Sequence, residues 1–219
     1  MWEERLLFID AEAMVIDKPA GLAVHPGPKT AESLEYYLPD LRFGFRREPS
    51  IVHRLDRDTS GCLLLARNPK AHKRYALAFE EARVSKSYLA ILAGVPSVEE
   101  GTIDMPLHKI SSAEQGWRMV HDAERGKRAV THWKVVGDAK GRAMLLMTPE
   151  TGRTHQLRIH ASEGIGIPIS GDPVYGAGRG PMLLHARSLA VAREGKATIE
   201  ATAPYPPTFL QAGFEDELG

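Results

Sequence analysis

One short segment of the chain gathers several reactive groups. His53–Gly61 has the sequence HRLDRDTSG and offers an imidazole, guanidinium groups and carboxylates. Apolar runs on both sides predict that it is a loop between two strands, and loops on a rigid scaffold often carry catalytic residues. A carboxylate such as Asp56 suits nucleophilic or general-base chemistry. The same residue types also form solvated turns, so composition leaves both interpretations open.

A second segment, Gly152–His160 with the sequence GRTHQLRIH, supplies a further arginine. If Thr154 caps a helix, Arg158 lies in its second turn and can project toward a partner loop. His155 and His160 would lie about 140° apart on a helix and on opposite faces of a strand. Neither arrangement converges on one ion, and the single cysteine, Cys62, adds no ligand pair. We therefore expect no metal site and a buried, inert thiol.

Five segments in a fixed order resemble those of the RluA-type pseudouridine synthases. His53–Gly61 resembles the HRLDxxTSG signature of that family, and Gly152–His160 resembles its GRTHQLRxH signature. Three further matches follow, and the last consists of two short segments counted together: Ile16–Leu22 (IDKPAGL), Lys86–Tyr88 (KSY), and Gly171–Gly176 (GDPVYG) with Leu184–Ala186 (LHA). The matches extend from about residue 13 to residue 187, which is most of the chain.

The resemblance implies a role for five residues. Asp56 matches the catalytic aspartate of the family, and Arg158 matches the arginine that pairs with it. Tyr88 matches the aromatic residue that stacks on the target base. Arg54 matches the arginine that enters the RNA where the base leaves, and Leu157 matches an apolar pocket residue. The resemblance also implies an α+β fold, with a bent, mostly antiparallel sheet, flanking helices and a central RNA-binding cleft.

The implied reaction converts uridine to pseudouridine, so no redox cofactor or metal is needed. The C1′–N1 bond breaks, the uracil turns, and C5 joins C1′. Asp56 would either attack C1′ or remove the 2′ proton, and the sequence does not separate these routes. Arg158 favours an ionised, oriented carboxylate. We add His53 and Thr59, which flank Asp56, as candidates for substrate binding.

Two other functions are compatible with parts of this pattern. A catalytically inactive RNA-binding module would keep the basic segments without the chemistry. A glycosidase acting on a small sugar would need a second carboxylate, and Asp58 is the nearby candidate in sequence. The set of Asp56, Tyr88 and Arg158 favours the RNA-modifying enzyme over both.

Apolar periodicity and turn residues predict the helices and strands that carry these residues. We expect a helix capped by Thr30 and ending at Leu38, and a helix that starts at Asn68-Pro69 and ends near Arg83. We also expect a helix from Thr154 to near Gly164. Strands are predicted at Arg5–Ile9, Ala13–Asp17, Ile51–Val52, Cys62–Ala66, Ser87–Ala93, Ala129–Val136, Ala143–Thr148, Leu183–Ala192 and Ala197–Ala203.

The charge distribution fits an RNA substrate better than the net charge does. Lysine and arginine equal aspartate and glutamate at 28 each, yet residues 42–90 hold eleven basic against five acidic residues, as do residues 124–193. We expect a structured RNA partner, either ribosomal RNA or a transfer RNA stem-loop. The start of the chain lacks the features of a signal peptide, and no run is long enough for a membrane span. We expect a cytoplasmic monomer with one stand-alone catalytic domain over residues 1–219, without an S4-type module.

Overall fold

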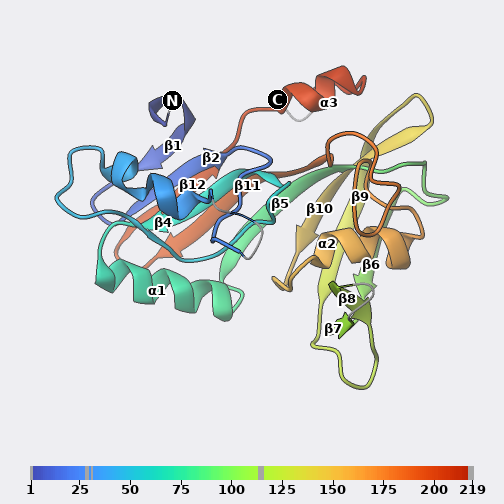
Figure 1. Cartoon of the computed structure of the whole chain (residues 1–219), viewed down its shortest axis with the longest axis horizontal. Coiled ribbons are helices and arrows are strands. Elements are labelled where there is room, and N and C mark those ends of the chain that lie inside the picture. Colours follow the sequence, from blue (N-terminus) through green and yellow to red (C-terminus); the bar gives the residue numbers. More distant parts are fainter. Residues whose placement is uncertain (1, 28–29, 31, 113–115, 217–219) are drawn as a thin grey trace. The chain divides into compact units, whose positions relative to one another are not determined.

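The computed structural model describes residues 2–27, 30, 32–112 and 116–216. The chain forms two compact units, Met1–Lys86 with Ala186–Pro204, and Ser87–His185 with Tyr205–Gly219. It is an α+β protein with mostly antiparallel strands and a few helices, which confirms the predicted fold class (Figure 1). The prediction of a single catalytic domain over residues 1–219 stays a prediction.

The first unit is built on antiparallel strands with one long helix. β2 pairs with both β1 and β4, β3 pairs with β4, and β12 pairs with β11. Its elements are η1 (Glu3–Arg5), β1 (Leu6–Ile9), β2 (Ala13–Lys18), η2 (Leu34–Arg42), β3 (Ser50–Ile51), β4 (Ser60–Ala66), α1 (Pro69–Glu80) and β12 (Lys196–Thr202). The strands β5 (Val84–Ile91) and β11 (Leu184–Arg193) begin in one unit and end in the other.

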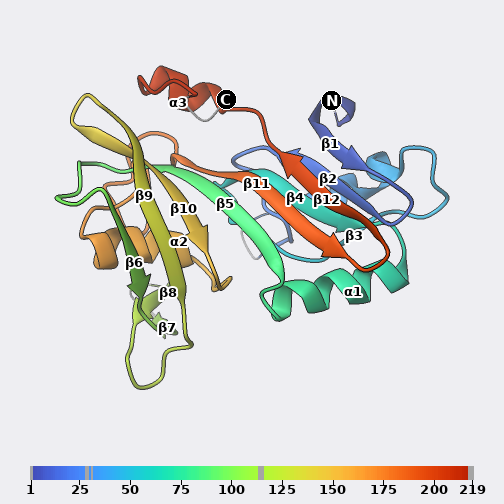
Figure 2. The ribbon, with the colours of Figure 1, turned by 180° about the vertical axis from the view of Figure 1, so that it is seen from behind.

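The second unit contains an antiparallel set in the order β5-β10-β9-β6 and a separate hairpin of β7 and β8. Figure 2 shows β6, β9 and β10 side by side. The elements are β6 (Glu100–Asp104), β7 (Leu107–Ser112), β8 (Gly116–His121), β9 (Val130–Ala139), β10 (Arg142–Pro149), α2 (Gln156–Ile159), the π-helical η3 (His160–Ile165) and α3 (Pro207–Gln211).

Helix α1 begins where the sequence predicts. The Oδ1 of Asn68 accepts a hydrogen bond from the backbone N–H of Ala71 at 2.9 Å, and Pro69 occupies the first helical position. The buried face of α1 carries Ala71, Tyr75 and Ala78, which pack in one apolar cluster with β2, β4 and β12. The helix therefore supports the strand that follows the HRLDRDTSG loop.

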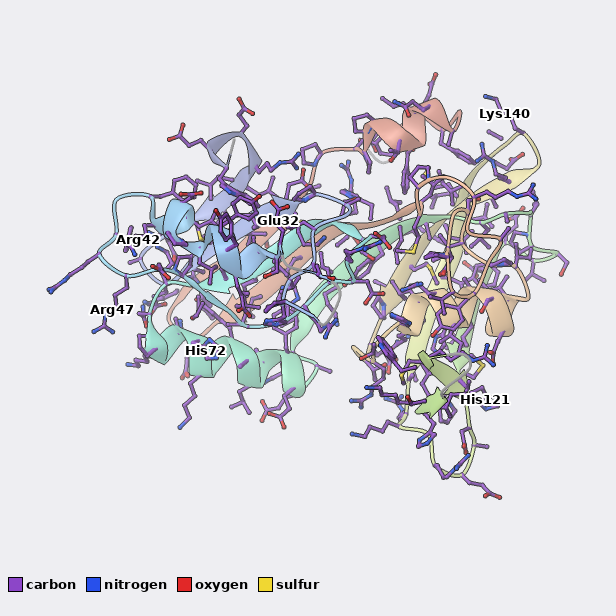
Figure 3. All side chains as sticks on the ribbon, viewed as in Figure 1. Glu32, Arg42, Arg47, His72, His121 and Lys140 are labelled. Carbon is purple, nitrogen blue, oxygen red and sulfur yellow. The ribbon has the colours of Figure 1, made fainter. Side chains whose placement is uncertain are left out.

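The strands predicted at Ala129–Val136 and Ala143–Thr148 are confirmed as β9 and β10, which are longer than expected and form a hairpin. Ala139 pairs with Arg142, so Lys140 and Gly141 alone form the turn. Both have positive φ, 53° and 71°, which is the geometry that matches the twist of a two-residue hairpin. Figure 3 labels Lys140 at this turn.

The helix predicted from Thr30 to Leu38 is wrong at its start and in its type. Thr30 instead exchanges backbone hydrogen bonds with Gly27, at 2.9 and 3.3 Å. The helix begins at Leu34, after Ser33, and continues as a 3-10 helix to Arg42. Because Ser33 precedes the first helical residue, Thr30 lies outside the N-cap position.

Several elements were not predicted from the sequence. They are η1 in the first unit, and β6, the hairpin of β7 and β8, and α3 in the second unit. Polar residues or glycine interrupt the apolar residues of β7 and β8, so these strands lack the apolar run that signals a buried strand. Among the residues that the structure describes, every helix is too short or too polar to traverse a lipid bilayer.

Candidate active site

In the first unit, the HRLDRDTSG loop connects β3 to β4. A turn closes it, because the backbone N–H of Thr59 donates to the carbonyl of Asp56 at 3.2 Å. Gly61 then starts the ladder with β2, with φ of +105°. A Cβ at Gly61 would lie 2.2 Å from the carbonyl oxygen of Ala186, so no other residue type fits. This close contact with the backbone fixes where the loop ends.

The side chain of Lys18, at the end of β2, binds the backbone of this loop. It is fully buried, and its Nζ donates to the carbonyl oxygens of Pro19 and Leu22 at 2.8 Å and of Arg57 at 3.1 Å. The N–H of Gly21 donates to the same Arg57 carbonyl at 2.9 Å. The KPAG segment is therefore tied to the residue that directly follows Asp56.

The environment of Lys18 has a measurable electrostatic consequence. Burial lowers the pKa of its ammonium group to about 8, although the carboxylates of Asp58, Asp56 and Asp17 act in the opposite direction. Each of these carboxylates favours the charged form, with Asp58 the largest influence. The sequence signal for this residue was the KPAG part of the Ile16–Leu22 segment.

His53 is held as a neutral ring at the start of the loop. It stacks on Phe79 of α1, with ring centroids 4.0 Å apart and planes 16° apart. Its Nε2 accepts a hydrogen bond from the backbone N–H of Leu64 at 2.9 Å. Enclosure by its neighbours and the charge of Lys86 lower its pKa to about 3. An acceptor role at Nε2 requires this unprotonated state.

The remaining candidates of the loop differ in exposure. Arg54 is exposed, Asp56 is half-buried and Thr59 is buried. The hydroxyl of Thr59 has no hydrogen-bond partner among the residues that the structure describes. Asp58 forms an ion pair with Arg57 at 3.1 Å, between largely solvated groups. The loop therefore presents Arg54 to solvent while its carboxylate Asp56 is partly enclosed.

In the second unit, the GRTHQLRIH segment is anchored by Gln156. Its buried amide donates to the carbonyl of Val130 at 2.9 Å and to the hydroxyl of Thr131 at 3.0 Å. Its Oε1 accepts from the hydroxyl of Thr151 at 2.7 Å and from the N–H of Arg153 at 3.0 Å. All four contacts connect the segment to the β9–β10 hairpin or close the turn before α2.

The prediction that Thr154 caps this helix is wrong. Helix α2 begins at Gln156, and His155 precedes it in the left-handed region with φ of 53°. No side chain caps the helix, because Gln156 satisfies the turn from inside. With this backbone conformation, the Nδ1 of His155 lies 3.0 Å from the hydroxyl of Tyr175.

Arg158 forms a two-point ion pair with Asp172 of the GDPVYG segment. Its Nε lies 2.8 Å from Oδ2, and its Nη2 lies 2.8 Å from Oδ1. Both residues are buried. The N–H groups of Val174 and Tyr175 also donate to Oδ1, at 2.8 and 3.0 Å. Asp172 thus fixes the guanidinium and closes its own loop at the same time.

The charge of Asp172 is stabilised by these contacts. Burial alone would raise the pKa of this carboxyl, but the hydrogen bonds and charge of Arg158 hold it below its ordinary value. The Tyr175 ring lies beside the same guanidinium, at 5.3 Å from its central carbon. No role was predicted for Asp172 from the sequence, although it belongs to the GDPVYG segment.

Tyr88 and Leu157 belong to the same apolar cluster of the second unit. Tyr88 lies on β5, opposite Met147 of β10, and packs half-buried against the cluster that contains Leu157. Leu157 is buried next to Arg158 on α2. The structure therefore brings Tyr88, Leu157 and Arg158 into one unit, while His53, Arg54, Asp56 and Thr59 lie in the other.

Comparison with known proteins agrees with this arrangement of segments. Residues 12–163 match the family model of RNA pseudouridylate synthases. An uncharacterized RNA pseudouridine synthase of Zymomonas mobilis is 59% identical over 215 residues, which cover 96% of this chain and 98% of that protein. The ribosomal large subunit pseudouridine synthase D of the same organism is 36% identical and is covered over 68% of its length, against 97% of this chain.

The fold is shared with a solved structure of the same kind. Human RNA pseudouridylate synthase domain containing 4 superposes with a TM-score of 0.81 at 25% identity, covering 96% of this chain and 92% of that one. The family match, the similar relative and the shared fold agree with the order of the motifs along the chain. The chain belongs to the RNA pseudouridine synthase family, and it is an isomerase that forms pseudouridine in RNA.

Proposed function

We propose that Asp56 is the catalytic carboxylate and that the substrate is a structured RNA, either large-subunit ribosomal RNA or a transfer RNA stem-loop. The observation that supports the assignment of Asp56 is the fixed backbone of its loop. Lys18 and Gly21 both donate hydrogen bonds to the carbonyl of Arg57, the residue directly after Asp56. A carboxylate that must reach one sugar atom needs such a fixed backbone. The similarity to a ribosomal large subunit enzyme supports the ribosomal choice.

Arg158 acts as the partner of Asp56 in this proposal. The contact with Asp172 uses two of the five N–H donors of its guanidinium and sets the plane of the group. A planar fork fixed on one edge presents its other edge in a defined direction. Asp172 is then a positioning residue that acts through Arg158.

The other candidates take up the extruded nucleotide. A uridine must leave its stack before a carboxylate can reach C1′, which costs a few kcal/mol. Tyr88 stacks on the base and Leu157 forms an apolar wall, in agreement with their shared cluster. Exposed Arg54 enters the RNA at the vacated position, while His53 and Thr59 shape the loop around Asp56. No cofactor takes part, and the enzyme works as a cytoplasmic monomer with one catalytic domain.

The chemistry conserves every atom of the substrate. Asp56 either bonds to C1′ as the C1′–N1 bond breaks, or removes the 2′ proton so that the uracil leaves and a glycal remains, and the detached uracil turns. C5 then bonds to C1′, which displaces Asp56 in the first route and is followed by return of the proton to C2′ in the second. In this proposal the C5 proton passes to the hydroxyl of Tyr88, which gives its own proton to solvent, and N1 takes up a proton. The leaving uracil takes the electrons of the broken bond and returns them in the new one, so no oxidant or reductant is required.

The test is to map pseudouridine by carbodiimide labelling and primer extension in unmodified transfer RNA and in ribosomal RNA fragments. Wild-type protein should create new stops in one RNA, and Asp56→Ala should remove them. Arg158→Lys should remain folded and lose most turnover, and Tyr88→Phe should bind RNA but fail to complete the reaction. Stops that persist with Asp56→Ala would exclude this carboxylate, and stops in neither RNA would exclude both substrate classes.

A further inference from the structure

The first unit contains a cavity of about 270 Å³ that the proposed chemistry does not use. It lies between the N-terminal turn, the KPAG segment and the start of η2, and Figure 3 labels Glu32 just before that helix. Its lining includes Trp2, Arg5, Pro19, Leu22, Glu32 and Tyr37. A volume slightly below the usual 300–1,000 Å³ of small-molecule sites suits one flat ring system better than a large cofactor.

The walls of this cavity are mainly aromatic and apolar. The rings of Trp2 and Tyr37 lie 5.6 Å apart and are tilted by 59°. Trp2 is 8% exposed, and its indole Nε1 is buried without a hydrogen-bond partner among the described residues. A buried indole N–H ordinarily finds an acceptor, so a residue of the cavity wall carries an unused donor.

Two charged groups complete the cavity. The guanidinium of Arg5 donates to the backbone carbonyl and to Oδ2 of Asp17, both at 3.2 Å, and its side chain is 36% exposed. Glu32 accepts a hydrogen bond from the hydroxyl of Tyr37. The cavity therefore combines aromatic surface with a cation and with a carboxylate that can accept N–H groups.

The cavity shares a wall with the loop that carries Asp56. Pro19 and Leu22 line the cavity, and their carbonyl oxygens both bind Lys18 Nζ. The same ammonium group binds the carbonyl of Arg57, one residue beyond Asp56. A ligand in the cavity is thus separated from the proposed catalytic loop by one layer of hydrogen-bonded backbone.

We propose that this cavity binds an unpaired nucleobase of the substrate RNA, from a nucleotide near the target uridine. Sequence-specific RNA recognition relies on splayed bases that stack on aromatic or arginine side chains and expose their edges to hydrogen bonding. Trp2 and Tyr37 supply the aromatic surface, Glu32 accepts from the base, and Arg5 attracts a phosphate. The proposal rests on the RNA-modifying function and extends it to substrate selection.

The first measurement detects the site without any catalysis. The chain has three tryptophans, so a ¹⁵N-labelled sample gives three indole N–H signals, and Trp2→Phe identifies that of Trp2. Each of the four nucleoside 5′-monophosphates is titrated into the Asp56→Ala protein at millimolar concentration. We expect a saturable shift of the Trp2 signal with at least one nucleotide, while the signal of buried Trp133 stays in place.

The second measurement connects the site to the substrate through a matched pair of variants. Tyr37→Ala removes a cavity wall, whereas Tyr36→Ala removes the neighbouring tyrosine, which is 74% exposed and does not line the cavity. Tyr37→Ala should raise KM for the RNA about tenfold and leave kcat within about twofold, as expected for loss of base stacking. Tyr36→Ala should leave both constants near those of the wild type.

The outcomes separate this proposal from the catalytic one. If the Trp2 signal does not shift with any of the four nucleotides, the cavity is not a base site, and this conclusion does not depend on the pseudouridine-forming activity. A shift together with an unchanged KM of Tyr37→Ala overturns its role in substrate binding and indicates a site for free nucleotides. An enzyme whose activity survives Asp56→Ala leaves the cavity proposal standing and refutes the catalytic assignment alone.

Discussion

Each unit contains a buried cation near proposed site residues: Lys18 in the first unit and Arg158 in the second. The groups that bind these two cations differ in kind. The ammonium of Lys18 binds three backbone carbonyls, and the carboxylates near it act only through space. The guanidinium of Arg158 forms a two-point ion pair with Asp172. One cation is stabilised by dipoles and the other by a full opposite charge.

The difference follows from the shape of each group. An ammonium is compact and directs three donors to separate points, so it can collect carbonyls from two segments of chain. A guanidinium is planar and fits one carboxylate along one edge. Lys18 therefore fixes the position of a backbone loop, and its pKa falls to about 8 because burial outweighs the opposing charges of the nearby carboxylates. Arg158 receives a fixed orientation instead.

The largest effect should come from removing the charge of Asp172. Asp172→Asn keeps the shape of the side chain but leaves Arg158 buried without its counter-charge, so we expect a loss of about 3–5 kcal/mol in the free energy of unfolding. Urea denaturation followed by circular dichroism measures it. Asp138→Asn, at an exposed position of β9, is the control and should change little. A loss below about 1 kcal/mol would show that the ion pair is not what holds Arg158.

A smaller effect is expected when the ammonium of Lys18 is removed. Lys18→Met fills the same space but leaves the carbonyls of Pro19 and Leu22 without this donor, which should cost about 2 kcal/mol of stability. Turnover should fall as well, because the loop after Asp56 loses its support. Lys73→Met, on the exposed side of α1, is the matched control. Unchanged turnover in a folded Lys18→Met protein would contradict the supporting role.

The pH dependence of the free energy of unfolding tests how the burial of Lys18 affects its charge. Between the folded pKa of Lys18, about 8, and its ordinary value of 10.5, the unfolded chain holds a proton that the folded protein has released. Stability should therefore rise with pH in this window, by on the order of 1 kcal/mol between pH 7.5 and 9.5. Lys18→Met supplies the baseline for all other groups. Parallel stability curves for the two proteins would show that Lys18 stays charged throughout.

The smallest effect is expected at Asp58, whose ion pair with Arg57 is largely solvated. Asp58→Asn should change stability by less than about 0.5 kcal/mol, as is usual for such pairs. It should still lower the pKa of Lys18 further, because Asp58 is the leading carboxylate that favours the ammonium. Carbon NMR of the lysine Cε signal measures this titration. A higher pKa of Lys18 in the Asp58→Asn variant would contradict the effect assigned to the Asp58 charge.

Local signals predicted most of the secondary structure near the site. The cap at Asn68, the β9–β10 hairpin and the strands flanking the HRLDRDTSG loop follow from turn residues and apolar runs of neighbouring residues. The caps predicted at Thr30 and Thr154 were wrong for one reason, since each helix begins further along the chain than its cap residue requires. The first starts at Leu34 after Ser33, and α2 starts at Gln156 after His155.

The family, the order of the motifs and the residue types available for chemistry follow from the amino-acid sequence, because they depend on neighbouring residues and on matches along the chain. The folded structure was needed to show that Asp172 binds Arg158, 14 positions earlier, and that Lys18 binds Arg57, 39 positions later. Such pairs are selected by burial: a cation removed from water must find acceptors wherever the folded chain provides them. Their identity therefore depends on which distant segments pack together, which no local pattern records.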